Sequence, residues 1–230
     1  MPLKFNDTVI ENTGHVQYNG NELDRLQLNG VTVWEKITEQ EIQNLTWTHM
    51  NTGASTTFVN GIYTNNATST QNWLAPSISS TFGTINNLKS LSFEADILMQ
   101  DKTAHGKEFY IGFYESQTIQ WWVFKIASGI GFGSSTIYYP IAESDIYDKI
   151  QNNIWYTYKF TVYPDDSAIQ LKVFETSSKN VIYSLSKYTD STLQQNFPTW
   201  LKSSNVTARI ALYGQQSQNE NLCKVFYTQL

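Results

Sequence analysis

The sequence predicts an all-β protein whose main part is an antiparallel jelly-roll sandwich. Aromatic residues are abundant, with 14 Tyr, 12 Phe and 7 Trp, while charged residues make up only 15% of the chain. Aromatic side chains suit the pleated, half-buried surface of a sheet. Several segments alternate apolar and polar residues with a period of two, and no helical stripe of useful length is present. A chain of 230 residues is long enough for one large β-domain preceded by a small module.

The first 36 residues are predicted to form a small β-hairpin module. Asn-Gly pairs at 19–20 and 29–30 are two-residue turn signals, because these residues tolerate the positive φ of a type I′ turn. They separate three strand-like segments, 15–18, 23–28 and 31–34. So few short strands bury too little surface to be stable alone in water. The module is therefore expected to dock on the rest of the chain, on a copy of itself or on a larger assembly.

The polar residues 37–43 are expected to form a linker or a short helix, which places the sandwich at residues 44–230. A third Asn-Gly pair, at 60–61, predicts a hairpin, and Pro164–Ser167 predicts a turn. Strands with one apolar face describe two antiparallel sheets packed over a common core. Five segments have this pattern: Leu91–Ile97, Phe109–Tyr114, Tyr156–Val162, Ile169–Phe174 and Val206–Tyr213.

Charge and hydropathy exclude several classes of partner. The net charge is −5, without a cluster of Lys and Arg, so we expect no nucleic acid partner. No apolar run approaches the roughly 20 residues of a membrane span, so no membrane insertion is expected. The first residues, Met1–Asp7, lack the apolar segment of a secretory signal peptide. Cys223 is the only cysteine, so it forms no intrachain disulfide and is expected to be a small buried hydrophobe.

The segment Val16–Glu35 resembles the short hairpin, with the pattern LNG followed by VWE, that is found at one end of many bacteriophage tail and fibre proteins. This resemblance implies that residues 1–36 attach the protein to other virion proteins. It also implies a location on the virion, with synthesis in the host cytoplasm and release by lysis.

The region from residue 44 to the C-terminus resembles the concanavalin A-like lectin/glucanase superfamily in the order and pattern of its strands. The resemblance rests on five segments: Ser92–Ile97, Glu108–Phe113, Asn153–Phe160, the hairpin about Asp165-Asp166, and Val206–Gly214. It implies a jelly roll. It does not decide the function, because this superfamily contains lectins, hydrolases and structural modules.

Two carboxylates, Glu94 and Asp96, share the outward face of one predicted strand. Glycoside hydrolysis needs such a pair, one to protonate the leaving oxygen and one to attack or to activate water. The laminarinase-like glucanases of the superfamily have a third acid three residues further on, whereas this chain has Met99 there and Gln100 next to it. We therefore expect a solvated strand face, no catalytic residues and no enzymatic activity.

No metal ion or cofactor is expected. His15, His49 and His105 are isolated, with no Cys or acid at ligand spacing. The Asp165-Asp166 pair offers oxygen ligands for calcium, but a plain turn explains it more simply. A nucleophilic serine in a G-x-S-x-G turn is absent from the sequence.

The aromatic residues predict a binding surface. Trp121 and Trp122 are adjacent in a strand and project to opposite faces. Trp122 shares its face with Phe124 and Ile126 and is expected in the core, whereas Trp121 shares its face with Lys125. By the same parity further residues lie off the core: Tyr110, Tyr114, Trp155, Lys159, Arg209 and Tyr213. Exposed Tyr and Trp beside Lys and Arg suit a sugar platform or a protein interface, and packing under loops is the third interpretation.

These observations lead to one expected function and two alternatives. We expect a non-enzymatic bacteriophage virion surface protein, such as a fibre, tail-tip or head-decoration component. Its N-terminus attaches to the particle, and its jelly roll binds a carbohydrate or another part of the host surface. Weak binding to single sugars favours a homo-oligomer with several sites. The alternatives are a concanavalin A-like glycosidase or lyase and a purely structural capsid or tail component.

Overall fold

The computed structural model divides the chain into two compact units, Met1–Glu39 and Gln40–Leu230. The backbone is described at residues 3–5, 8–10, 16–18, 21–23, 25–28, 31–35, 38–43, 45, 48–49, 56–59, 62–65, 77–81, 84–99, 109–114, 121–126, 129–133, 138–143, 146–203, 205–206, 209–214, 218–221 and 224–229. Within these ranges, side chains are described at residues 38–43, 45, 84–98, 146, 148–203 and 227–229.

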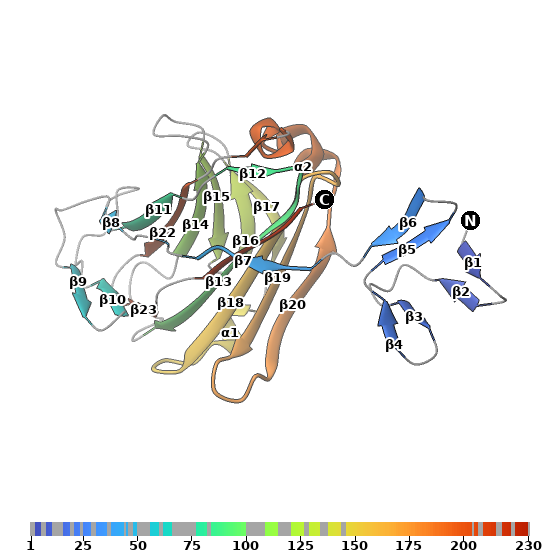
Figure 1. Ribbon diagram of the computed structural model, residues 1–230. Helices are drawn as coiled ribbons and strands as arrows, with labels where there is room; N and C mark the ends of the chain where they lie inside the picture. Colours follow the sequence, from blue (N-terminus) through green and yellow to red (C-terminus); the bar gives the residue numbers. More distant parts are fainter. Residues whose placement is uncertain are drawn as a thin grey trace. The chain divides into compact units, whose positions relative to one another are not determined.

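The first unit contains three antiparallel strand pairs (Figure 1). They are β1 (Leu3–Phe5) with β2 (Thr8–Ile10), β3 (Val16–Tyr18) with β4 (Asn21–Leu23), and β5 (Arg25–Leu28) with β6 (Val31–Glu35). The second and third pairs enclose the Asn-Gly pairs that predict turns. Segment 23–28 was expected to be one strand, but it is divided between β4 and β5. The role of this unit as an anchor stays a prediction.

The second unit contains a nine-stranded antiparallel sheet, counted over the described residues. Its central strand β13 (Leu88–Met99) pairs with β18 along one edge, and with β24 and then β23 along the other. The other strands are β7 (Gln40–Glu41), β9 (Thr56–Val59), β10 (Ile62–Asn65), β18 (Trp155–Tyr163), β19 (Ala168–Glu175), β20 (Val181–Tyr188), β23 (Gln218–Asn221) and β24 (Lys224–Gln229).

Strand β7 corrects part of the expected linker at 37–43. Gln40 and Glu41 pair with β24 opposite Tyr227 and Phe226, and the Tyr227 hydroxyl donates a hydrogen bond to Gln40 Oε1 at 2.9 Å. A two-residue exposed strand has no apolar alternation, so its sequence reads as a linker although its backbone pairs with the sheet.

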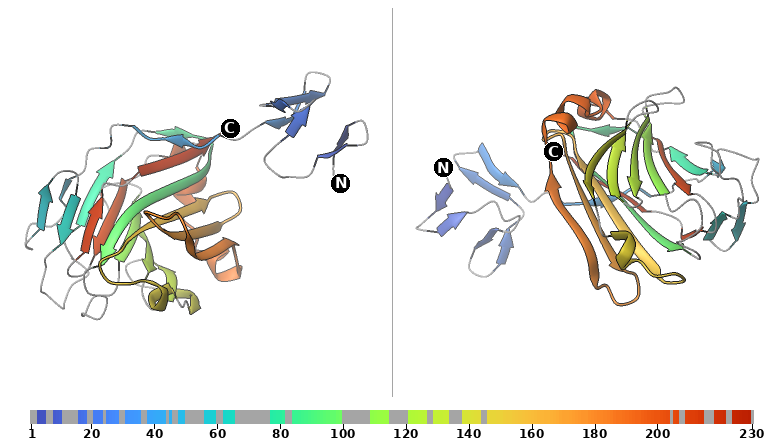
Figure 2. Two further views of the ribbon diagram at one scale, coloured as in Figure 1. Left: turned by 90° about the horizontal axis from the view of Figure 1, so that it is seen from below. Right: turned by 180° about the vertical axis from the view of Figure 1, so that it is seen from behind.

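A seven-stranded antiparallel sheet, again counted over the described residues, forms the second layer (Figure 1, Figure 2). Its order is β17 (Tyr138–Glu143), β16 (Gly129–Gly133), β15 (Trp121–Ile126), β14 (Phe109–Tyr114), β22 (Arg209–Gly214), β11 (Ser77–Thr81) and β8 (Thr48–His49). The expected strand Val206–Tyr213 is divided between β22 and β21 (Asn205–Val206), which pairs with β12 (Ile85–Asn86). The predicted all-β sandwich is confirmed.

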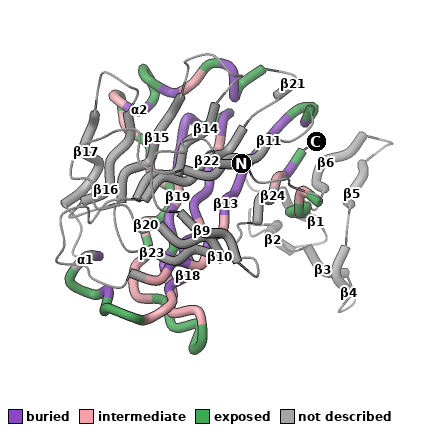
Figure 3. The backbone as a smooth tube through the Cα atoms, turned by 90° about the vertical axis from the view of Figure 1, so that its left-hand side faces the viewer, coloured by how far each residue is buried: buried purple, intermediate pink, exposed green. Residues whose placement is uncertain are grey.

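The core lies against the inner face of the nine-stranded sheet, where the buried parts of β13, β18 and β19 run side by side (Figure 3). Phe93, Phe160 and Leu171 form one cross-strand row and are all 0% exposed. Burying a side chain of this size contributes about 1.5–3 kcal/mol. The predicted apolar faces of these three strands are therefore confirmed: Leu91, Phe93, Ala95, Ile97, Tyr156, Tyr158, Phe160, Val162, Ile169, Leu171 and Val173 are all buried.

Short helices add to the core between the longer strands. Ile146 of α1 (Ile146–Lys149) is buried, as are Leu193 of α2 (Ser191–Asn196) and Leu201 of η1 (Thr199–Lys202). The N-cap of α2 is Asp190, whose carboxylate accepts a hydrogen bond from the Leu193 amide at 2.7 Å. No helix in the described part of the chain has the length and apolar character needed to cross a bilayer.

Candidate functional site

The six residues predicted to form a binding surface are divided between the two sheets. Trp155 and Lys159 belong to β18 of the nine-stranded sheet. The other four belong to the seven-stranded sheet: Trp121 and Lys125 on β15, and Arg209 and Tyr213 on β22. Sequence parity assigned all six to surfaces away from the core, but it gave no information on which sheet carries each strand.

The register of the seven-stranded sheet brings four of the six residues together with two tyrosines. Strand β14 lies between β15 and β22, with Tyr110 opposite both Lys125 and Tyr213, and Tyr114 opposite both Trp121 and Arg209. Residues directly opposite one another share a face of the sheet, and residues four apart on a strand share it too. We call the result the aromatic–cationic face, which consists of Tyr110, Tyr114, Trp121, Lys125, Arg209 and Tyr213.

The aromatic–cationic face has two rows separated by small residues. One row is Tyr213–Tyr110–Lys125 and the other is Arg209–Tyr114–Trp121. Between them the register places Ala211, Gly112 and Val123. The spacing of residues and strands in a sheet sets the rows about 13 Å apart along the strands, with each row about 10 Å across.

The opposite face of the same three strands is apolar. Ile111 of β14 is opposite Phe124 and Leu212, and Phe113 is opposite Trp122 and Ile210. The buried inner face of the nine-stranded sheet needs an apolar cover, and sandwiches are covered by the apolar face of the second sheet. This assigns the aromatic–cationic face to the outside of the sandwich. The side chains of these strands lie outside the described ones, so the assignment comes from register and residue pattern.

Trp155 and Lys159 lie on the outer face of the nine-stranded sheet, because their neighbours Tyr156 and Tyr158 are buried in the core. Both are half-buried. Lys159 is opposite Glu94 on β13 and Lys172 on β19, so this face carries charges of both signs. The structure does not bring Trp155 and Lys159 together with the aromatic–cationic face, and their binding role stays a prediction.

Glu94 and Asp96, the two carboxylates considered for catalysis, lie on β13 of the nine-stranded sheet. The Thr157 hydroxyl donates a hydrogen bond to Asp96 Oδ1 at 2.6 Å, and Thr157 is also bonded to Thr176 at 3.0 Å. Glu94 is directly opposite Lys159. Glycosidase carboxylates flank the bond that is cleaved, whereas these two lie along one strand and have cross-strand neighbours. Both are half-buried, so the expectation of a solvated strand face holds only in part.

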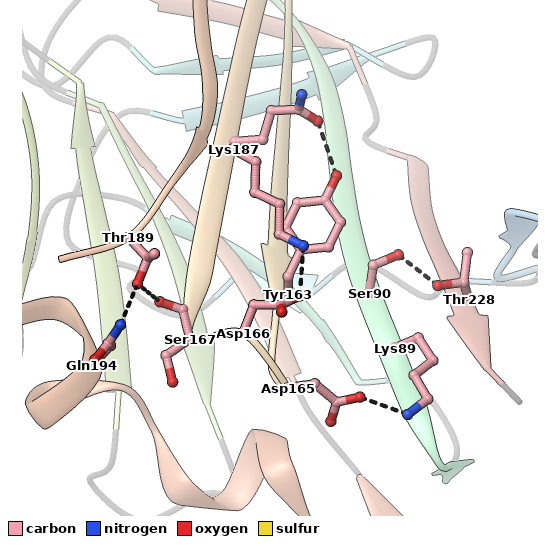
Figure 4. Close-up of polar contacts among 11 residues, drawn as sticks. Lys89, Ser90, Tyr163, Asp165, Asp166, Ser167, Lys187, Thr189, Gln194 and Thr228 are labelled. Atoms are coloured by element: carbon pink, nitrogen blue, oxygen red, sulfur yellow. Dashed lines mark hydrogen bonds and ion pairs between the residues drawn. The ribbon is translucent and has the colours of Figure 1, made fainter. Parts of the chain in front are cut away.

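Two ion pairs involve the aspartates of the turn between β18 and β19 (Figure 4). Asp165 is paired with Lys89 at 2.6 Å and Asp166 with Lys187 at 2.5 Å. Ser167 has a positive φ of 47° and its amide donates to the Pro164 carbonyl, which closes the predicted turn. Within the described ranges, no group of three or more His, Cys, Asp or Glu residues is arranged to hold a metal ion. The side chains of the three histidines and of Cys223 lie outside the described ones.

Comparison with known proteins finds similarity in structure but no match in sequence. No protein-family model matches the sequence, and no curated protein matches it. Among solved structures, lectin II from Ulex europaeus matches with a TM-score of 0.52 at 9% identity over 84% of this chain and 99% of its own. Winged bean acidic lectin, in complex with methyl-α-D-galactose, matches with a TM-score of 0.51 at 11% identity over 84% and 98%.

A third match is arcelin-5, a lectin-like defense protein from Phaseolus vulgaris, with a TM-score of 0.50 at 9% identity over 84% of this chain and 99% of that one. At these identities the likeness shows the fold. The chain therefore contains the jelly-roll fold that the resemblance predicted, and the structures that it matches include lectins.

Proposed function

We propose that this protein is a non-enzymatic glycan-binding protein and that the aromatic–cationic face is its binding surface. The observation that carries the proposal is the register that aligns Tyr110 with Tyr213 and Lys125, and Tyr114 with Trp121 and Arg209. An aromatic ring offers a flat apolar surface to the C–H groups of a sugar, while Tyr, Arg and Lys supply hydrogen bonds for its hydroxyls. The fold supports this role, because lectins are among its neighbours.

The finer proposal places this binding surface on a bacteriophage particle. The short strand pairs of Met1–Glu39 form a separate unit, and their sequence resembles the hairpin of tail and fibre proteins. In this account residues 1–36 attach to other virion proteins, and the jelly roll contacts the host surface. Several copies on one particle convert a weak single-site affinity into stable attachment.

A second candidate function is a purely structural contact within the particle. Tyr, Trp and Arg are enriched at protein interfaces as well as at sugar sites, so the same face suits a neighbouring subunit. Binding measurements separate the two functions, since only the first requires affinity for a free glycan.

The test is binding of the full chain to an array of bacterial surface polysaccharides, with release of reducing ends measured on the same samples. We expect binding to at least one polysaccharide without hydrolysis. Trp121→Ala should weaken that binding by about tenfold, or about 1.4 kcal/mol, because it removes one aromatic contact surface for the sugar. Trp155→Ala is the matched control, because it removes the same side chain from the other sheet.

Three outcomes contradict the proposal in different ways. No binding to any glycan, by a folded protein, favours the structural function. Weaker binding in Trp155→Ala but not in Trp121→Ala moves the site to the nine-stranded sheet. Release of reducing ends that is lost in Glu94→Gln or Asp96→Asn identifies a glycosidase.

A further inference from the structure

The aromatic–cationic face differs in charge from the protein as a whole. The chain carries a net charge of −5, but this face contains Lys125 and Arg209. The neighbouring strand β11 adds Ser77, Ser79 and Thr81 to the same face, opposite Tyr213, Ala211 and Arg209. Among the residues that the described strands β11, β22, β14 and β15 place on this face, none is Asp or Glu. The nearest acid in the described part of this sheet is Glu143 of β17, two strands beyond Lys125 and opposite Gly129. A positive surface on an acidic protein indicates a ligand with negative charge.

The two cations occupy opposite corners of the face. Lys125 of β15 lies at one end of the row that contains Tyr110. Arg209 of β22 lies at the end of the row that contains Tyr114, on the other side of β14. The distance between the rows is about 13 Å, and two strand spacings across the sheet add about 10 Å. This placement suits two anionic groups on different sugars of a chain better than a single anionic group on one sugar.

The chemistry of the two cations restricts the class of ligand further. A guanidinium group offers paired N–H donors that match a carboxylate or a phosphate, and such charged hydrogen bonds are stronger than neutral ones. An ammonium group binds the same anions as a point charge. Tyr110 and Tyr114 are on the strand between the two cations, and Tyr213 and Trp121 occupy the other two corners. These aromatic residues supply the flat apolar surface for sugar rings.

We propose that the ligand of the aromatic–cationic face is an acidic polysaccharide, with carboxylate or phosphate groups repeated along its chain. This inference rests on the proposed glycan-binding function and specifies its substrate class. Lys125 and Arg209 each bind one anionic group, and the aromatic residues contact the sugars between them. Binding is therefore expected to weaken as salt is added, because salt screens the attraction between the two cations and the anionic groups.

The test compares each acidic polysaccharide with its neutralised form. One arm uses uronic acid polysaccharides beside the same polymers after reduction of their carboxyl groups. The other arm uses a phosphorylated mannan beside the dephosphorylated polymer. We expect at least one acidic form to bind about a hundredfold more tightly than its neutral counterpart, because neutralisation removes two charged hydrogen bonds of about tenfold each. The difference should decrease when the salt concentration is raised from about 0.05 M to about 0.5 M.

Matched variants locate the effect on the protein. Lys125→Gln and Arg209→Gln should each reduce the preference for the acidic form by about tenfold. Lys172→Gln removes the same charge from an exposed position on the outer face of the nine-stranded sheet and should leave the preference unchanged. A thermal melt of each variant shows that the fold is retained.

The outcomes distinguish this inference from the proposed function. Equal affinity for acidic and neutralised polymers overturns the acidic ligand but leaves glycan binding in place. No binding to any polymer, acidic or neutral, contradicts both. A loss of preference in Lys172→Gln that equals the loss in Arg209→Gln also overturns the inference, because it assigns the effect to overall charge.

Discussion

At the scale of single residues, Asp190 shows how one side chain fixes a local structure. Its carboxylate accepts hydrogen bonds from the Leu193 amide at 2.7 Å and from the Tyr188 hydroxyl at 2.6 Å. The bond from the Leu193 amide, and then the bond from Tyr188, lower the pKa of Asp190 because both stabilise the charged carboxylate. Helix α2 begins at this point and places Leu193 and Phe197 in the core.

The lowered pKa predicts how stability depends on pH. The folded-state pKa of Asp190 lies below its unfolded value of about 3.9. The stability that the charged carboxylate of Asp190 contributes is therefore fully present above the unfolded-state pKa. It is lost as the pH falls through the folded-state pKa. Asp190→Ala should lower the free energy of unfolding at pH 7 by about 0.5–2 kcal/mol, the usual cost of losing an N-cap.

The measurement is urea denaturation of both proteins at pH 7 and at about pH 3. The difference between wild type and Asp190→Ala should shrink at the lower pH. Asp190→Asn is the control, because it keeps an acceptor for the Leu193 amide without a charge. Its free energy of unfolding at pH 7 should lie between those of Asp190→Ala and wild type. A difference that is equal at both pH values would show that the charge of Asp190 contributes nothing.

The sequence predicted the face of the sheet on which a residue lies wherever apolar and polar residues alternate along the strand. The alternation in Phe109–Tyr114 and in the strand of Trp121 separated one apolar face from one aromatic and cationic face, and the register agrees with that separation. It gave no information on which sheet carries Trp155 and Lys159, because parity gives a face but not a sheet. Asp190 was missed although Asp is a common N-cap, since a helix of six residues has no apolar stripe to reveal it.

At the scale of elements, the outer face of β13 is more buried than its polar residues suggested. Ser90 is 6% exposed and Ser92 only 1% exposed. Their hydroxyls are hydrogen-bonded across the sheet, Ser90 to Thr228 at 2.8 Å and Ser92 to Thr161 at 2.9 Å. Short hydroxyl side chains at these positions satisfy one another, so polar residues are accommodated there without solvent. Sequence alternation alone does not distinguish such pairs from a solvated face.

Edge strands were the least predictable elements. Val181–Tyr188 forms β20, an end strand of the nine-stranded sheet, yet exposed and half-buried residues do not alternate regularly along it. Its pairing with β19 includes two register shifts, and Val181 is 61% exposed. An edge strand with irregular pairing buries neither face consistently, so no period of two appears in its sequence. Such irregularities also protect an edge from pairing with another chain.

At the scale of the whole molecule, the sandwich was predictable because several central strands each have one apolar face. The order of the strands within each sheet was not predictable, since β13 pairs with β18, β23 and β24, which are far away in the sequence. The binding face depends on that order. Arg209 and Trp121 are separated by almost ninety residues in the printed sequence, and only the position of β14 between their strands places them in one row.

The division into two units predicts the result of a deletion. Removing residues 1–36 should leave the melting temperature of the jelly roll unchanged. If the proposed virion function is correct, it should also leave glycan binding unchanged and prevent assembly into the particle. Removing residues 1–43 is the matched control, because it also removes β7 and the hydrogen bond from Tyr227 to Gln40. The longer deletion should lower the free energy of unfolding by about 0.5–1.5 kcal/mol per lost hydrogen bond.

Thermal melts and an assembly assay check this prediction. Normal incorporation of the shorter deletion into particles would show that residues 1–36 are not the anchor. Unfolding of the shorter deletion would show that the first unit is required for the stability of the second.

The central claim is that the seven-stranded sheet presents its aromatic–cationic face to the outside and its apolar face to the core. Trp121 and Trp122 are adjacent on β15, opposite Tyr114 and Phe113 respectively, and therefore lie on different faces. The most direct test is the free energy of unfolding of Trp121→Ala and Trp122→Ala, measured by urea denaturation. Trp122→Ala should cost about 3–5 kcal/mol, because it removes a large core side chain and leaves a cavity, whereas Trp121→Ala should cost much less. Equal large losses, or a larger loss in Trp121→Ala, would contradict the orientation of this sheet and with it the assigned binding face.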